Sequence, residues 1–250
     1  MTETPTDYRA VVSELLALWD EQIEKSTVTL RLDLAYWATP ILVRGLTAHA
    51  VDAARAVLTL YRAKQTIAAV PLVRAVMEDA LTAVWLLADA DAARSFRSDA
   101  AMQRARTLRE ILSRVDDPAD VEAKLRESRS IIEELGTPSR HLIEQRFRAL
   151  DGGDGGLYLQ YRIMSSLTHA GAGVIDLYSA PDDRAPTRAV FRAYGAHPTA
   201  AAWMSSTATY LLHALGAWDA CQLDHPQAAR LRALADRMGL RSEYAVATTE

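Results

Sequence analysis

Apolar residues recur every three to four positions along almost the whole chain, and this spacing constrains the fold more than any other feature. Such a spacing places the apolar side chains on one face of an α-helix. Only 11 glycines and 9 prolines are available to turn 250 residues, which is too few for a protein built of many short strands. The sequence therefore predicts an all-α fold, a single multi-helix bundle of about eight to nine helices.

Capping and turn residues divide the chain into the expected helices. These helices span about residues 7–25, 40–64, 66–88, 91–115, 118–135, 138–150, 156–178, 199–222 and 226–238. The clearest break is the glycine-rich run 151–156, and the one long segment without helical spacing is 181–198. We expect that irregular segment to form a short strand or a lid. The whole chain, 1–250, is predicted to be one domain with its core at about 35–222 and with tails at 1–6 and 240–250.

Composition excludes several classes of protein. Half of the residues are hydrophobic and 24% are charged, so the chain can bury a core and is not disordered. A net charge of −4 gives no overall attraction to nucleic acid or to an anionic membrane. The polar N-terminus lacks the features of a signal peptide, and the longest apolar run, 83–88, is far too short to span a membrane. We therefore expect a cytoplasmic location and no membrane partner.

Two charged residues stand on a helix that is otherwise apolar on all sides. Arg74 and Glu78 lie four residues apart within 66–88, among side chains such as Val70, Leu81 and Trp85. A helix that is apolar all round is normally buried, and an isolated charge there would be costly. The pair is therefore predicted to form a buried ion pair, which is either a structural salt bridge or the polar centre of a functional site.

A second polar stripe follows the glycine-rich break. Helical spacing brings Tyr158, Arg162, Ser165, Ser166 and His169 onto one side of the expected helix 156–178. Short hydroxyls with an arginine and a histidine favour a half-buried pocket over an ordinary solvated face. Two helical turns separate Arg162 from His169, so both would point the same way. A guanidinium can then hold a phosphate while the imidazole acts as general acid or base, as metal-free cleavage of RNA through its 2′-hydroxyl requires.

These motifs support two resemblances. The string from Leu72 to Glu78, the arginine-rich stretch 94–114 and the pattern Tyr-Arg-x2-Ser-x3-His ending at His169 resemble an all-helical bacterial family catalogued only as a domain of unknown function. That resemblance covers about residues 35–220. It implies that an Arg–Glu pair and a Ser–His pair form the polar centre, and it implies no established activity.

The spacing of Arg162 and His169 is also similar to the motif of the HEPN superfamily, many of whose members are dimeric, metal-independent ribonucleases of toxin and phage-defence systems. This resemblance implies a homodimer that binds or cleaves RNA. Arg162 would hold the scissile phosphate and His169 would transfer the proton. Arg74 and Glu78 would orient them, and Ser165 would bind a phosphate oxygen.

Two further interpretations remain open. The bundle is alternatively a small-molecule-binding or biosynthetic protein that holds a polar or anionic ligand near Arg74, Glu78, Tyr158 and His169. It is otherwise a non-catalytic structural or interaction bundle, so whether it is an enzyme stays undecided. We expect no metal and no cofactor, because the sequence has no His/Cys cluster and no phosphate-binding glycine loop, and the acidic run 116–120 is interpreted as a helix cap.

Overall fold

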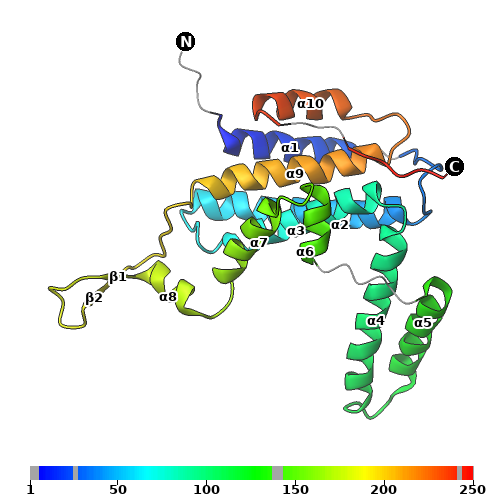
Figure 1. The fold of residues 1–250 in the computed structure, drawn as a ribbon, viewed down its shortest axis with the longest axis horizontal. Coiled ribbons are helices and arrows are strands. Elements are labelled where there is room, and N and C mark those ends of the chain that lie inside the picture. Colours follow the sequence, from blue (N-terminus) through cyan, green and yellow to red (C-terminus); the bar gives the residue numbers. More distant parts are fainter. Residues whose placement is uncertain (1–5, 25–27, 137–142, 241–243, 250) are drawn as a thin grey trace.

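A computed structural model describes residues 6–24, 28–136, 143–240 and 244–249, and these form ten α-helices and one two-stranded sheet (Figure 1). The predicted all-α class is confirmed. The helices and strands are α1 (Tyr8–Glu24), α2 (Thr39–Arg62), α3 (Val70–Ala88), α4 (Ala92–Leu112), α5 (Ala119–Leu135), α6 (Ile143–Leu150), α7 (Gly156–Ser166), α8 (Ala172–Tyr178), β1 (Ser179–Pro181), β2 (Ala189–Phe191), α9 (Ala202–Ala220) and α10 (Ala228–Arg237).

Helices α2, α3 and α9 form the centre of the bundle and pack along one another. α1 and α10 cover the outer side of α9, while α6 and α7 cross α3 from another side (Figure 1). α3 touches α2, α4, α6, α7 and α9, so partners surround it, as its apolar circumference predicts. Most of its side chains, from Val70 to Leu87, are buried.

The packed core is larger than the sequence suggests. α1 lies before the expected core, yet Val11, Val12 and Leu15 are completely buried against the bundle. At the other end, we expected residues 240–250 to fray, but the described part of this tail, 244–249, packs on the bundle. Ala247 donates its backbone N–H to Leu87 O at 2.7 Å. Tertiary contacts therefore order this segment, although it has no helical pattern of its own.

Helices α4 and α5 form an antiparallel hairpin that projects from the bundle (Figure 1). A small core of Ala105, Leu108 and Leu125 joins them. Most arginines of the 94–114 run lie on the outside of α4, where they are exposed. Arg97 differs, because its guanidinium stacks on Trp37 at 5.3 Å from the ring centroid and donates a hydrogen bond to the hydroxyl of Tyr36.

The expected helix 156–178 is two helices, which accounts for ten helices where nine were predicted. α7 ends at Ser166, and α8 begins only at Ala172. The backbone N–H and the hydroxyl of Thr168 both donate to Ser165 O, at 3.1 and 2.9 Å, and so close a turn in place of the next helical bonds. The chain then changes direction, and α8 leaves the bundle.

After α8 the chain forms a β-hairpin, so of the two alternatives expected for 181–198, a short strand or a lid, the structure has a strand there, β2. β1 and β2 pair antiparallel with Ser179 opposite Phe191 and Pro181 opposite Ala189. The hairpin projects from one end of the bundle, to the left in Figure 1. We call residues 178–197 the arm.

No helix in the described ranges is long and apolar enough to cross a membrane.

Candidate functional site

The polar stripe predicted on α7 divides into two faces. Arg162, Ser166 and His169 are exposed to solvent, whereas Tyr158 and Ser165 are half-buried towards the bundle. His169 lies in the bend after α7, so it does not continue the helical face of Arg162. The geometry expected for one continuous helix is therefore absent, and both residues are exposed instead of lining a half-buried pocket.

The half-buried side of α7 meets Arg74 of α3. The Nη2 of Arg74 donates to the hydroxyl of Tyr161 at 2.6 Å, and its guanidinium carbon lies 4.7 Å from the centroid of that ring. Tyr158 stacks on Tyr161 at 6.2 Å, and Phe147 meets it edge-on at 5.5 Å. The guanidinium of Arg74 thus packs against a cluster of aromatic rings. Tyr161 opens the sequence motif that ends at His169, but it was not among the predicted site residues, although it lies one helical turn from both Tyr158 and Ser165.

The ion pair of Arg74 and Glu78 is weaker and more open than expected. The separation of Arg74 Nη2 and Glu78 Oε2 is 3.5 Å, and the two side chains are 24% and 41% exposed. Because α6 and α7 cover α3 only in part, this face of the helix stays accessible, which corrects the prediction of a fully buried pair. Such an exposed pair contributes little to stability, so Arg74 interacts more strongly with Tyr161 than with Glu78.

Hydrogen-bonding capacity is unused where α3, α6 and α7 meet. Arg74 Nε, Arg146 Nε and Ser165 Oγ are buried and have no partner within the described parts of the chain. The guanidinium of Arg146 lies 4.9 Å from the ring centroid of Trp85 and 5.6 Å from that of Phe96. Burial lowers the pKa of Arg146, against the opposing charges of Asp99 and Glu78. Unmet buried donors cost free energy, so this junction is suited to a polar ligand.

A second polar pair links α2 and α3. His49 Nδ1 lies 2.6 Å from Asp79 Oδ2; the histidine side chain is 67% exposed and the aspartate is 13% exposed. Burial raises the pKa of Asp79 to about 6, although His49 opposes the shift. No pattern in the sequence joins these two residues, because they lie on different helices. No group of three or more His, Cys, Asp or Glu side chains placed to hold a metal occurs in the part of the chain that the structure describes.

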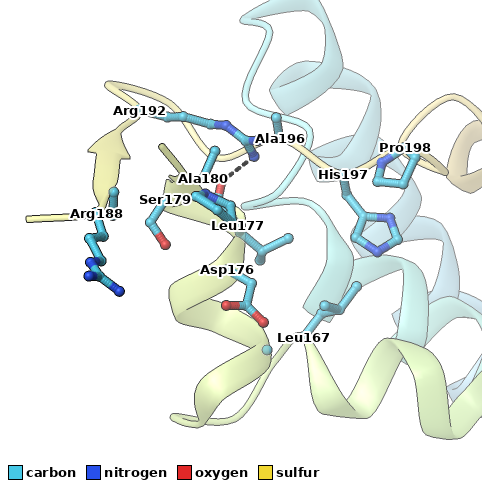
Figure 2. Close-up of a pocket in the computed structure, with 13 residues that line it drawn as sticks. Leu167, Asp176, Leu177, Ser179, Ala180, Arg188, Arg192, Ala196, His197 and Pro198 are labelled. Carbon is cyan, nitrogen blue, oxygen red and sulfur yellow. Dashed lines mark hydrogen bonds between the residues drawn. The ribbon is translucent and has the colours of Figure 1, made fainter. Parts of the chain in front are cut away.

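An open hollow lies beside the bend after α7. Its volume is about 740 Å³, and it lies between α8, the hairpin and residues 192–198 (Figure 2). Asp176 and His197 face one another across it, and Arg188 and Arg192 line its hairpin side. Leu167 and Gly173, which flank His169 in the sequence, line the same hollow. The turn that carries His169 therefore borders this space.

His197 is held in a defined orientation in the hollow. Its ring stacks on Trp203 with centroids 5.3 Å apart. Its Nδ1 accepts the backbone N–H of Thr199 at 3.2 Å. In the neutral ring the proton therefore resides on Nε2, which is available as a donor. From the sequence we predicted only a short strand or a lid in this segment, because nothing local predicts that these side chains converge.

Large apolar side chains are exposed on the arm and beside it. Phe191 and Tyr194 are 80% and 79% exposed, and Ile175 of α8 is 66% exposed. The two aromatic residues alternate along the chain with Arg188 and Arg192. Such large exposed apolar groups commonly mark a surface that binds a partner.

These features define an all-α bundle protein with a projecting basic and aromatic arm next to an open hollow. The chain belongs to the family of unknown function DUF5677, whose model matches residues 41–185. This match confirms the expected membership in a family catalogued without a function, and it includes Arg74, Glu78, Arg162 and His169. No curated protein and no solved structure matches the chain.

Proposed function

We propose that the protein binds single-stranded RNA on its arm and on the adjoining turn after α7. The observation that carries this proposal is the exposure of Phe191 and Tyr194, at 80% and 79%, in alternation with Arg188 and Arg192. Unpaired bases stack on exposed aromatic rings, and arginines neutralise the phosphates between those bases. The arrangement therefore suits a flexible single strand better than a rigid duplex.

Arg162 and His169 supply the groups for cleavage next to this surface. Both are exposed, and the turn bearing His169 borders the hollow that Arg188 and Arg192 line. In the proposed reaction His169 takes the proton of a 2′-hydroxyl, the 2′-oxygen attacks phosphorus, and the bond to the 5′-oxygen breaks. The departing 5′-oxygen takes up the proton from His169, which leaves a 2′,3′-cyclic phosphate and a 5′-hydroxyl. Arg162 holds the phosphate oxygens. This assignment follows the HEPN resemblance and needs no metal.

Binding is tested by fluorescence anisotropy of a labelled single-stranded RNA. We expect the double substitution F191A/Y194A to weaken binding by about tenfold or more, because each stacked base contributes roughly 1–3 kcal/mol. The matched control is Trp37→Ala, which removes an aromatic side chain that is 66% exposed and lies outside the arm, just before α2 begins. Equal affinity of the double variant and the wild type would contradict the proposal.

The arginines are tested through salt dependence. Log K for a single strand falls with log salt at a slope of roughly −0.7 per neutralised phosphate. The variant R188Q/R192Q is expected to make that slope shallower by about one to two phosphate contacts. Arg104→Gln and Arg106→Gln, on the exposed side of the projecting α4, should leave it unchanged. If the slope changes in the α4 variant and not in the arm variant, the RNA binds on α4 and the proposed binding surface is wrong.

Cleavage is tested separately from binding. His169→Ala is expected to abolish cleavage with little effect on affinity, while Arg162→Ala should reduce both. If the double variant H169A/R162A cleaves RNA at the wild-type rate, the ribonuclease assignment is wrong, and RNA binding through the arm is still judged by its own test.

A cytoplasmic location and a homodimer belong to this proposal, and light scattering of the purified chain tests the dimer.

A small polar or anionic ligand is the second candidate function. The unpartnered buried atoms Arg74 Nε and Ser165 Oγ, on the facing helices α3 and α7, favour it. Such a ligand would raise the Tm of the wild type, and Ser165→Ala would reduce that rise. Phosphate and nucleotide monophosphates are suitable probes. A bundle that binds neither RNA nor these probes would have the structural role that the sequence left open.

A further inference from the structure

A separate pocket lies at the end of the bundle opposite the arm, where α1 ends, α9 ends and α10 begins (Figure 1). It encloses about 210 Å³ and is lined by Gln22, Val28, Thr29, Gln222, Asp224, Pro226 and Gln227. Its three glutamines are only 4–7% exposed. Buried amides are uncommon unless their hydrogen bonds are satisfied, so the bonding of these glutamines shows what the pocket requires.

One tryptophan sets the orientation of two of these amides. Trp218 Nε1, which can only donate, lies 3.1 Å from the side-chain oxygen of Gln22. The Nε2 of Gln22 therefore faces Gln222, and it donates to Gln222 Oε1 at 2.6 Å. The Nε2 of Gln222 in turn donates to Trp218 O at 3.3 Å. Each amide nitrogen carries a second N–H beyond the one used in this chain of bonds.

The third glutamine supplies an unused acceptor. Gln227 is 5% exposed, and its Oε1 is buried without a hydrogen-bond partner among the residues that the structure describes. Its backbone is fixed, because its N–H donates to Asp219 Oδ1 at 2.8 Å. A carbonyl held out of water without a donor is costly. The pocket therefore combines an acceptor that lacks a donor with amide N–H groups on the two other glutamines.

We propose that this pocket binds a small uncharged molecule with a cyclic amide edge, in which an N–H stands next to a carbonyl oxygen, as in a pyrimidine ring. The N–H of the ligand donates to Gln227 Oε1, and its carbonyl oxygens accept from the amides of Gln22 and Gln222. The volume equals about seven water molecules, which suits a single six-membered ring and is too small for a nucleotide.

Charge favours a neutral ligand. Among the described residues that line the pocket none is a lysine or arginine, and Asp224 at the exposed edge repels anions. Neutral amides compensate poorly for the desolvation of an ion. This site does not depend on the RNA proposal, because it lies at the other end of the bundle and uses none of the same residues.

The test compares uracil with 1,3-dimethyluracil by ligand-observed NMR on the full chain. The two rings share their carbonyl groups, but the dimethyl compound has no N–H. Uracil is expected to bind at millimolar concentration and the dimethyl compound is not. This comparison needs no variant, so it stays informative whatever a substitution does to folding.

Variants then locate the binding. Gln227→Leu removes the acceptor and keeps the backbone bond to Asp219, so the chain should stay folded and its affinity for uracil should fall about five- to tenfold. The matched control is Gln65→Leu, on the exposed turn after α2, which should bind as the wild type does. The proposal is overturned if uracil does not bind, if both rings bind equally, or if Gln227→Leu leaves uracil binding unchanged.

Discussion

Helix α9 and the arm differ in how far they bury their apolar side chains. In α9, 14 of 19 residues are buried, and its apolar side chains extend around the whole helix. In the arm, the aromatic side chains of Phe191 and Tyr194 are 80% and 79% exposed. Burial of apolar area stabilises α9 at roughly 25 cal/mol per Å², whereas the arm gains little from these two rings. The difference suggests that the sequence of α9 serves stability and that the aromatic residues of the arm serve binding.

The largest expected effect is on the α9 side of this comparison. Leu212→Ala removes a side chain that is completely buried between helices. A leucine-to-alanine change in a core costs about 3–4 kcal/mol, from lost burial and from the cavity left behind. Urea denaturation of the variant should show that loss in the free energy of unfolding. A loss below about 1 kcal/mol would mean that α9 is not the centre of a close-packed core.

The second effect concerns Asp79, a mostly buried carboxyl group within the bundle. Burial holds the pKa of Asp79 at about 6, against an ordinary value of 3.8. Between these values the unfolded chain has lost the proton while the folded chain keeps it, so a rise in pH from 4 to 6 disfavours the folded state. Asp79→Asn lacks this titration. Its stability relative to the wild type should therefore increase over that range by up to about 3 kcal/mol and stay level above pH 6.

The measurement is chemical denaturation of both proteins at several pH values. His49 is the ion-pair partner of Asp79, and Glu78 is the nearby like charge. Asp52→Asn, on the exposed side of α2, serves as the control and should show no such difference. A relative stability that falls as the pH rises would show that the charged form of Asp79 is favoured in the folded chain.

The third effect tests where the core ends. A methyl group at Gly216 of α9 would come inside contact distance of the Tyr244 ring. Gly216→Ala is therefore expected to destabilise the chain by about 2 kcal/mol through overpacking, despite the better helix propensity of alanine. In a Tyr244→Ala background the same change should be neutral or stabilising. Equal costs in both backgrounds would show that residues 244–249 do not pack on α9.

The smallest effect is expected on the arm. Phe191→Ser replaces a ring that is 80% exposed, so the free energy of unfolding should change by less than about 0.5 kcal/mol. The same variant should bind single-stranded RNA more weakly. A stability loss as large as that of Leu212→Ala would remove the contrast between the two regions, because Phe191 would then be part of a core.

The sequence predicted much of the fold because helices are local structures. Apolar spacing and capping residues placed most helix ends within a few residues, and a short strand was one of the two alternatives expected for 181–198. The break after Ser166 was not predicted, since it depends on how Thr168 bonds to the preceding carbonyl. That break also decides the candidate site, because it removes His169 from the helical face of Arg162.

Site contacts were harder to predict than helices. Arg74 and Glu78 were identified as unusual because a charge on an apolar helix needs a partner. The stronger partner, Tyr161, lies 87 residues away in the sequence. Likewise His49 and Asp79 are 30 residues apart, and Gln22 and Gln222 are 200 apart. No periodicity within one segment contains information on such pairs.

The sequence by itself determined the all-α class, the approximate helix ends, the family and the residues that are chemically out of place. These properties depend on the side chains of neighbouring residues and on one repeating geometry. Only the tertiary structure decided which polar groups meet, which remain without partners, and that the arm exposes its aromatic residues. The physical reason is that contacts between distant segments depend on how whole helices pack, and that packing is a property of the complete chain.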